Sequence, residues 1–144
     1  MSGIEALIRE SFARQTIMAT IGARLESIEA GRVSIALPFA PHLCQQHGFL
    51  HAGVVTTIAD SACGYAALSL MPEGSSVLTV EFKVNLMAPA KGDMFLAEGH
   101  VVKAGRTLKI TQGEVIALDR DRRTTVAIIT ATLMRLDAKP GAAG

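Results

Sequence analysis

One segment constrains the fold more than any other: the run from His51 to Met71 is apolar, rich in alanine and free of strand-like alternation. Pro72 and Gly74 follow it, so the pattern predicts a helix of about twenty residues, roughly 30 Å long at 1.5 Å rise per residue. Because apolar side chains lie nearly all round this helix, most of its sides must be buried. Asp60 stands at its centre, and a charge at the centre of a bilayer is costly. The sequence therefore predicts a buried helix of a globular domain and not a membrane span.

Strand signals surround this helix. A short amphipathic helix is predicted at Gly3 to Arg14, where apolar residues recur at helical spacing. Alternation from Ile21 to Leu25 and from Val33 to Leu37 predicts a hairpin, and residues 39–50 have no period and predict a loop. After the long helix, alternating segments separated by short turns predict an antiparallel meander. Its strands are Val77 to Met87, Met94 to Lys103, Thr107 to Leu118 and Thr124 to Leu136.

This order of elements predicts an α+β domain of two layers, in which a six-stranded antiparallel sheet covers the long helix. The 144 residues fit a single domain, predicted at residues 1–136, with an N-terminal helix in residues 1–15 and a disordered tail at 137–144. Hydrophobic residues make up 49% of the chain and charged residues 19%, which favours a surface partly covered by a second copy. We therefore expect an oligomer.

Composition excludes several classes of function. The 14 basic and 13 acidic residues leave a net charge of +1 without a basic cluster, which argues against nucleic acid as a partner. Cys44 and Cys63 make no disulfide framework, and charges near the N-terminus leave no signal peptide, so a cytoplasmic location is expected. His42, Cys44, His47 and His51 lie close in sequence and suggest zinc ligands. The carboxylate of the HExxH motif is missing, however, and we expect no metal.

Two features of the long helix can carry chemistry. Asp60 lies among apolar neighbours, and an unpaired aspartate is rarely buried, so it is either functional, exposed to a solvated groove or paired with a structural arginine. His51 precedes the first helical turn, where unpaired N–H groups favour negative charge. His51 and the Ala52 amide can both donate to a carbonyl, although His51 can equally be a helix cap.

The spacing of these residues predicts a site shared between two chains. Asp60 lies nine residues beyond His51, roughly 13 Å along the helix axis, so it cannot reach a carbonyl held at the start of its own helix. If both act on one substrate, they come from antiparallel helices of a two-fold dimer. The turn from Lys103 to Thr107 carries two cations, and either contacts phosphate or is an ordinary solvated hairpin.

Several motifs together resemble a known family. The run Gln45-x-x-Gly48-x-x-His51-x-Gly53, followed by Asp60 in an alanine-rich helix, resembles the hotdog-fold acyl-CoA thioesterases of the phenylacetate-pathway (PaaI-like) group. The same resemblance is carried by Val77-Leu78-Thr79-Val80-Glu81-Phe82, Met87-Ala88-Pro89-Ala90 and Gly105-Arg106-Thr107-Leu108. It covers about residues 15–136. It implies a hotdog fold, in which the sheet wraps around the long helix.

The resemblance also implies roles for the residues at the long helix. Asp60 falls at the position of the catalytic carboxylate, which acts as nucleophile or general base. Gln45 falls where members contact the thioester or orient the attacking water. His51 and the Ala52 amide fall at the site of the thioester carbonyl. Members usually have glycine where this chain has Ala52. Ala52 keeps the backbone amide donor, but its methyl group narrows the approach to that amide.

Two further sets of residues are implied outside the helix. Thr79 falls where some members have a hydroxyl that places the water, although strand alternation puts Thr79 on the polar face with Glu81 and Lys83, opposite an apolar face. The apolar face comprises Leu78, Val80, Phe82, Val84 and Leu86. A segment that often contacts coenzyme A in the family corresponds here to Lys103, Gly105, Arg106 and Thr107. Coenzyme A is then part of the substrate, and no cofactor is needed.

The function predicted from the sequence is hydrolysis of an acyl-CoA or aryl-CoA thioester by a homodimer or a dimer of dimers. A non-catalytic acyl-CoA-binding hotdog protein is the alternative, and the alanine at position 52 favours it. Hydration or dehydration is a second enzymatic alternative, but the different motif of those relatives is not found. The acyl group and the choice between a nucleophilic and a general-base Asp60 stay open.

Overall fold

The computed structural model describes residues 2–137 and contains every predicted strand after the long helix. All but the first residue of the predicted disordered tail lies outside the described residues. The helices are α1 (Ser2–Arg14), α2 (Thr16–Ile21) and α3 (Ala52–Leu68), with a 3₁₀ turn at Pro41–Leu43. The strands are β1 (Arg24–Glu29), β2 (Arg32–Pro38), β3 (Ser76–Leu86), β4 (Met94–Ala104), β5 (Leu108–Asp119) and β6 (Arg122–Leu136).

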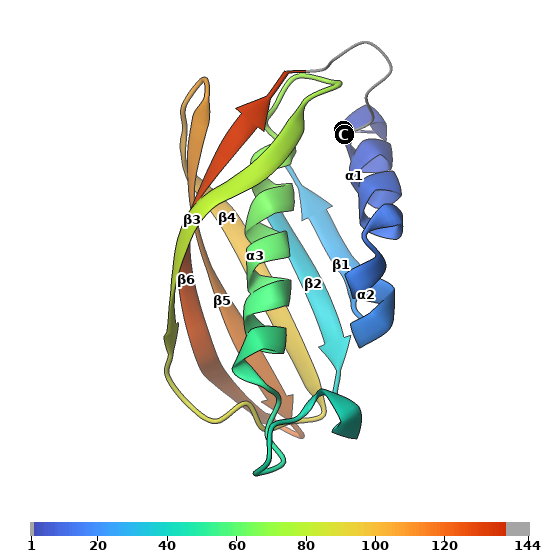
Figure 1. Ribbon diagram of the computed structural model, residues 1–144, viewed down its shortest axis with the longest axis vertical. Helices are drawn as coiled ribbons and strands as arrows, with labels where there is room; N and C mark the ends of the chain where they lie inside the picture. Colours follow the sequence, from blue (N-terminus) through green and yellow to red (C-terminus); the bar gives the residue numbers. More distant parts are fainter. Residues whose placement is uncertain (1, 138–144) are drawn as a thin grey trace.

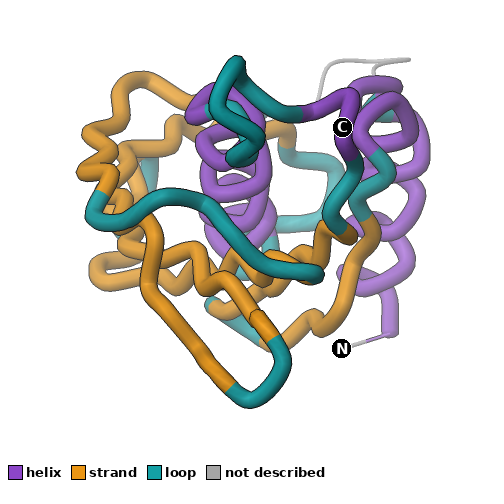
Figure 2. The backbone as a smooth tube through the Cα atoms, turned by 90° about the horizontal axis from the view of Figure 1, so that it is seen from below, coloured by secondary structure: helices purple, strands orange, loops and turns teal. Residues whose placement is uncertain are grey.

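The six strands form one antiparallel sheet in the order β1-β2-β4-β5-β6-β3, which curves around α3 (Figure 1). Figure 2, a view turned by 90°, shows the strands bending around α3 on one side and α1 lying on the other. Ile58 of α3, Ile35 of β2 and Phe95 of β4 are fully buried, so the core lies between helix and sheet. Ile8 and Met18 add α1 and α2 to the same core. The predicted α+β fold with a central helix is confirmed.

Two facing glycines let α3 lie directly on the sheet. Gly99 of β4 pairs with Gly113 of β5, and a Cβ on Gly99 would lie 2.6 Å from the backbone nitrogen of Cys63. A Cβ on Gly113 would lie 2.5 Å from the Glu98 carbonyl oxygen, so neither position tolerates a side chain. Burial raises the pKa of the Cys63 thiol to about 11. This thiol therefore stays protonated near neutral pH and is a packing group, not a nucleophile.

The structure corrects two predictions, one about the pairing of β3 and one about where the first hairpin begins. Strand β3 does not form a hairpin with β4; it pairs with β6 at the far edge of the sheet, so the meander contains only β4, β5 and β6. Residues 87–93 connect β3 to β4: the Met87 amide donates to the Val126 carbonyl of β6 at 2.8 Å, and the Asp93 amide donates to the Leu118 carbonyl of β5 at 2.9 Å. Ile21 ends α2 and does not begin a strand, because Met18 and Ile21 share one buried helical face. Gly22, with φ of 82°, ends that helix.

A β-bulge in β3 changes which of its residues face α3. The pairing with β6 shifts register between Thr79 and Glu81. Thr79 pairs with Leu133 and Phe82 pairs with Ala131, and both partners are buried under the helix. Thr79 and Phe82 therefore point to the same side, although they are an odd number of residues apart. The prediction that Thr79 lies on the polar face with Glu81 is wrong. The prediction that the apolar residues of this strand share a single face is also wrong.

The edge strand β3 and the residue that follows it expose several apolar side chains. Five of them are between 48% and 58% exposed: Leu78, Val80, Phe82, Leu86 and Met87. An unpaired edge with such side chains is a site for pairing with another chain. None of the helices within residues 2–137 is long and apolar enough to cross a membrane.

Candidate functional site

Asp60 lies in the middle of α3 with its carboxylate held from the neighbouring strand. The Thr79 hydroxyl donates a hydrogen bond of 2.7 Å to Asp60 Oδ1. Asp60 is half-buried, and this burial raises the pKa of its carboxyl, an effect that the Thr79 hydrogen bond partly offsets. A raised pKa makes the ionised carboxylate a stronger base than an ordinary aspartate. The bulge in β3 is what turns Thr79 toward this carboxylate.

A groove runs beside Asp60 between α1, α3 and β3, and we call it the Asp60 groove. It has a volume of about 380 Å³, near the lower end of the range for small-molecule sites. Its lining includes Thr79 beside the carboxylate and, further along α3, Gly64 and Tyr65. Gln15 enters it from the junction between α1 and α2.

Gln15 belongs to a chain of hydrogen-bonded side chains that the sequence did not predict. The Ser61 hydroxyl donates to Gln15 Oε1 at 3.1 Å, and Gln15 Nε2 donates to the Tyr65 hydroxyl at 3.0 Å. The Ser11 hydroxyl lies 3.2 Å from the same Tyr65 oxygen. Polar residues in an otherwise amphipathic N-terminal segment were the available signal, but only the fold shows that they meet α3.

The loop before α3 presents the amide group of Gln45. Gln45 Oε1 accepts from the His47 amide at 2.6 Å and from the Phe49 amide at 3.2 Å, while Gly48 makes the turn with φ of 84°. These bonds use the carbonyl end of the side chain. Among the described residues nothing accepts from Gln45 Nε2, so this end can donate to a ligand.

His51 caps α3 and still leaves a donor at the helix start. Its Nδ1 accepts from the Gly53 amide at 2.8 Å, so in the neutral ring Nε2 carries the hydrogen. The alternative that His51 is a helix cap is thus confirmed, and the exposed Nε2–H can still donate a hydrogen bond. Within residues 2–137 no group accepts from the Ala52 amide, the first of the helix. In the same range no three His, Cys, Asp or Glu residues gather to hold a metal ion.

A second cavity, which we call the loop cavity, adjoins these donors. It has a volume of about 460 Å³, and Gln45 and Ala52 line it. Leu86 and Met87, at the end of β3, form part of its wall. The structure therefore brings Gln45 and Ala52 together at one place, and Asp60 and Thr79 together at another. It does not bring the two sets together within one chain, since Asp60 lies roughly 13 Å along α3 from His51.

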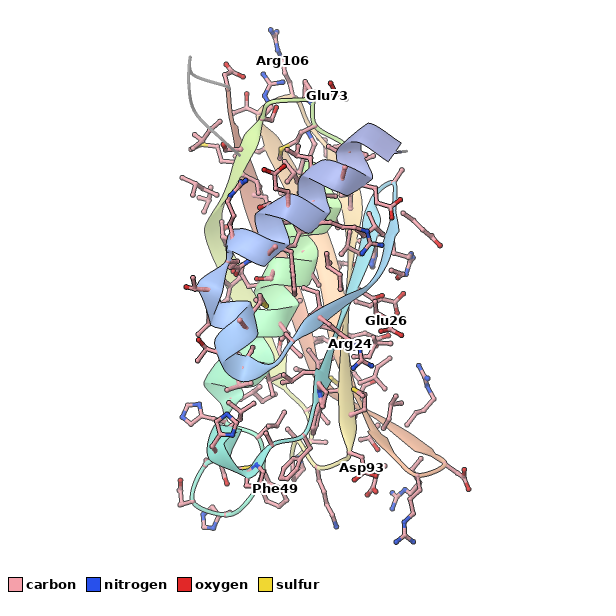
Figure 3. The ribbon with its side chains drawn as sticks, turned by 90° about the vertical axis from the view of Figure 1, so that its right-hand side faces the viewer. Arg24, Glu26, Phe49, Glu73, Asp93 and Arg106 are labelled. Carbon is pink, nitrogen blue, oxygen red and sulfur yellow. The ribbon has the colours of Figure 1, made fainter. Side chains whose placement is uncertain are left out.

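The turn between β4 and β5 carries the residues predicted to contact coenzyme A. A Cβ on Gly105 would lie 2.5 Å from the Leu108 carbonyl oxygen, so the tight turn requires glycine. Lys103, Arg106 and Thr107 are exposed. Figure 3 shows Arg106 at one end of the molecule and Phe49, in the loop before α3, at the other.

One buried cation next to this turn was missed. Lys109 Nζ donates to the Gly105 carbonyl at 2.8 Å and so braces the turn from below. Burial lowers the pKa of Lys109, and the charge of Arg135 lowers it further. The sequence did contain a pattern that could have indicated this burial: Lys109 alternates with Thr111 and Gly113, which lie on the inward face of β5.

Comparison with known proteins agrees with this architecture. A model of the Thioesterase superfamily matches residues 47–124. The crystal structure of a thioesterase family protein from Silicibacter pomeroyi is 50% identical, with a TM-score of 0.92, and the match covers 94% of this chain and 99% of that one. The E. coli PaaI protein from the phenylacetic acid degradation operon has a TM-score of 0.84 over 94% of this chain and 95% of its own; at 18% identity this likeness shows the fold alone.

A curated relative carries a more specific name. It is the 1,4-dihydroxy-2-naphthoyl-CoA hydrolase of Listeria monocytogenes, 23% identical over 94 residues, which are 65% of this chain and 76% of the relative. The predicted hotdog fold, with its long helix wrapped by the sheet, is confirmed by the family match and by the Silicibacter structure.

Proposed function

Because the chain belongs to the thioesterase superfamily, we propose that it hydrolyses an acyl- or aryl-CoA thioester to the free acid and coenzyme A. One observation carries the proposal: the Asp60 carboxylate, with its raised pKa, is fixed by Thr79 on the wall of a groove of acyl-group size. The Listeria relative is named for a CoA thioester, which supports coenzyme A as the leaving group.

We infer that a second copy of the chain completes each site. The Asp60 groove includes Val77 and Leu78 at the start of β3, and the loop cavity includes Leu86 and Met87 at its end. If two β3 edges pair antiparallel about a two-fold axis, the start of one strand lies beside the end of the other. The Asp60 groove of one subunit then meets the loop cavity of its partner. The exposed apolar side chains of β3 support this pairing.

In such a dimer the two sets of groups divide the reaction. The partner subunit's Ala52 amide and His51 Nε2–H donate to the thioester oxygen and stabilise the negative charge that develops there. Gln45 Nε2 adds a third donor nearby. Asp60 either takes a proton from a water that attacks the carbonyl carbon, or attacks it directly to form an anhydride that water then cleaves. In both routes the carbon–sulfur bond breaks and coenzyme A leaves as its thiolate.

The turn at residues 103–107 is the proposed contact for the phosphates of coenzyme A. Lys103 and Arg106 supply exposed charge, while Gly105 and Thr107 shape the turn. Lys109 keeps that shape by holding the Gly105 carbonyl.

The test is a panel of acyl- and aryl-CoA thioesters assayed for release of free thiol. We expect turnover of at least one member and its loss in Asp60→Asn. Binding of the thioesters without thiol release from any of them would contradict hydrolysis and favour the acyl-CoA-binding alternative. With an active substrate, single turnover in ¹⁸O-labelled water separates the two routes, because only the anhydride route incorporates ¹⁸O into the Asp60 carboxyl.

A further inference from the structure

We propose that Phe82 of one subunit covers the hydrogen bond between Thr79 and Asp60 in its partner and keeps water away from that carboxylate. Phe82 is then a positioning residue of the partner's site and not of its own. The inference rests on the proposed function, because it takes Asp60 as the catalytic carboxylate and uses the antiparallel pairing of two β3 edges. It gives the dimer a second task besides bringing the two cavities together.

Phe82 lies on the helix side of the sheet, where its own chain does not cover it. It pairs with Ala131 of β6, which is 1% exposed under α3, yet Phe82 itself is 48% exposed. A phenylalanine on the inner face of a sheet normally adds its large apolar area to the core. Because β3 is the last strand of the described sheet, the open side of Phe82 is the side on which a second β3 would pair.

The β-bulge decides how two β3 strands fit together. Val80 has no partner on β6, so the residues that face α3 have odd numbers before it, as Thr79 does, and even numbers after it, as Phe82 and Val84 do. Residues directly opposite each other in an antiparallel pair have their side chains on the same face. Pairing about a two-fold axis sets the residues before one bulge opposite the residues after the other. An odd-numbered residue must therefore lie opposite an even-numbered one.

The register that meets this condition and keeps most of β3 paired sets Thr79 directly opposite Phe82 of the partner subunit. Ser76 then lies opposite Asn85 of the partner subunit, so nearly the whole strand takes part. Directly opposite residues have their Cβ atoms about 4.5–5.5 Å apart. A shift by two residues moves Phe82 of the partner subunit to the diagonal position, about 7–8 Å away, which an aromatic side chain still reaches. The contact therefore does not depend on a single register.

The hydrogen bond that this ring covers is open in the single chain. Thr79 is exposed and Asp60 is only half-buried, although a bond of 2.7 Å joins them. An apolar ring on the open side removes water from the carboxylate, which disfavours its ionised form and strengthens its bond to the Thr79 hydroxyl. Burial within the chain already raises the pKa of Asp60, and the ring acts in the same direction. Each subunit thus makes the carboxylate of the other a stronger base.

The experiment compares two heterodimers that carry the same two substitutions, Asp60→Asn and Phe82→Ala, in different arrangements. In the split heterodimer each chain carries one substitution, so the single remaining Asp60 faces an intact Phe82 of the partner subunit. In the joined heterodimer one chain carries both substitutions and the other is wild type, so the remaining Asp60 faces the substituted position. Any weakening of the dimer is therefore the same in both. Two affinity tags purify each heterodimer, and native mass spectrometry verifies its composition.

The split heterodimer should have about half the activity of wild type, because one of its two sites is intact. The joined heterodimer should be at least about threefold less active than the split one, a small part of the about 10²–10⁴-fold that a general base contributes. The acid limb of its kcat/KM profile should lie at lower pH, because a carboxyl open to water ionises more readily. Arg14 and Tyr65 in the groove, Cys63 on α3 and the partner's His51 also face Asp60, and they are the same at the remaining site of both heterodimers.

Two further variants sharpen the comparison. Phe82→Leu in the joined arrangement keeps an apolar side chain over Thr79 and should bring the turnover and the pH profile back toward those of the split heterodimer. Phe39→Ala is the matched control, because Phe39 is a phenylalanine of similar exposure, 38%, directly after β2. Combined with Asp60→Asn, it should give split and joined heterodimers of equal activity.

A titration of the remaining Asp60 carboxyl by ¹³C NMR separates this inference from the proposed function, since it needs no substrate. Its pKa should be lower in the joined heterodimer than in the split one. If no thioester is hydrolysed but this order is observed, the hydrolysis is wrong and the role of Phe82 stands. If the pKa is the same in both heterodimers, if the split one has the lower pKa, or if the chains form no dimer, the role of Phe82 is wrong even where hydrolysis is observed.

Discussion

The Asp60 groove and the loop cavity lie along the same helix but contain opposite chemistry. The groove holds a carboxylate with a raised pKa and a hydroxyl that fixes it. The loop cavity holds donors: the Ala52 amide and Gln45 Nε2, with His51 Nε2–H at the helix start beside them. A thioester hydrolase needs both a base and donors for the oxyanion. Each cavity therefore contains half of the required groups, and β3 passes along both.

The two cavities also differ in how they are built. Short-range bonds from Gln45 to the amides of His47 and Phe49 shape the donor side of the loop cavity, and the Leu50 amide joins that side to the opposite wall by donating to the Ala90 carbonyl at 3.1 Å. The Asp60 groove depends on contacts between distant parts of the chain, including Thr79 with Asp60 and Gln15 with Tyr65. Because these side-chain bonds of one cavity do not involve those of the other, a side-chain substitution in one should leave the bonds of the other in place.

The largest expected effect comes from removing the base. Asp60→Asn keeps an oxygen that can accept from Thr79 but cannot take a proton from water or attack the carbonyl. Turnover should fall by at least about a hundredfold, the usual scale for a general base, while the circular dichroism spectrum stays native. Glu81→Gln is the control, because it neutralises an exposed carboxylate on the outward face of β3. Activity of Asp60→Asn within threefold of wild type would refute the assignment of Asp60.

Mixing two inactive variants tests whether the cavities cooperate across subunits. His51→Asn retains a side-chain oxygen to cap the Gly53 amide but lacks the Nε2–H donor. When it is mixed with Asp60→Asn and the subunits exchange, one of the two sites in each heterodimer carries neither change. Random mixing makes about half the dimers heterodimeric, so about a quarter of wild-type activity should return.

Two conditions make this result decisive. Native mass spectrometry must show that the subunits have exchanged, and each variant alone must be nearly inactive. If activity then stays at the level of the parents, Asp60 and His51 act within one chain and the antiparallel pairing of β3 is wrong.

The contrast between the cavities also explains what the sequence could predict. The elements from α3 to β6 followed from apolar periodicity, and the residues at the start of α3 followed from a motif that is contiguous in the chain. Thr79 was implied by resemblance, but alternation placed it on the wrong face. One extra residue in a strand reverses the alternation after it, and nothing in the side-chain pattern of β3 marks where the bulge lies.

The alternation of apolar and polar residues could not predict which strands pair, or which distant residues are in contact, for a related reason. The strand signal of β3 does not reveal whether its edge pairs with β4 or β6, because both strands alternate apolar and polar residues and are long enough to pair with all of β3. Gln15 and Lys109 have ordinary neighbours in sequence, and their contacts form only when the junction between α1 and α2 packs against α3 and when β5 lies in the sheet.

A smaller effect is expected from the turn that we assign to the coenzyme A phosphates. Replacing Lys103 and Arg106 by alanine should raise KM by roughly 2- to 30-fold, because two exposed ion pairs contribute about 0.2–1 kcal/mol each. The turnover number should change less, since contacts distant from the thioester bind ground state and transition state about equally. The effect should also shrink at high salt.

The control for this prediction removes the same charge elsewhere. Arg9 on α1 and Arg24 on β1 are exposed, and their double alanine variant should leave KM and inhibition by free coenzyme A near wild type. A loss confined to kcat in the Lys103–Arg106 variant, or unchanged inhibition by coenzyme A, would show that this turn does not bind the phosphates of coenzyme A.

The smallest expected effect is a change of stability that distinguishes Asp60 from an ordinary surface carboxylate. Burial raises its pKa above the ordinary value of 3.8, so the folded protein holds this proton more tightly than the unfolded chain does. As pH rises from about 3.8 through the raised pKa, the unfolded chain ionises first and the free energy of unfolding falls. At pH values above both the folded and the unfolded pKa of Asp60, the loss in the free energy of unfolding is constant. At pH values below both pKa values, there is no loss.

Asp60→Asn cannot ionise and escapes this penalty. Its Tm at neutral pH should therefore exceed that of wild type, on the order of 2–4 °C for each kcal/mol in a domain of about this size. The difference should close as the pH is lowered toward 4, whereas Glu81→Gln should follow the wild-type curve throughout a series of thermal melts. A Tm of Asp60→Asn below wild type at every pH would mean that the folded dimer favours the ionised carboxylate. The donors of the partner subunit's loop cavity would then stabilise Asp60 in the resting enzyme, and burial would no longer account for its strength as a base.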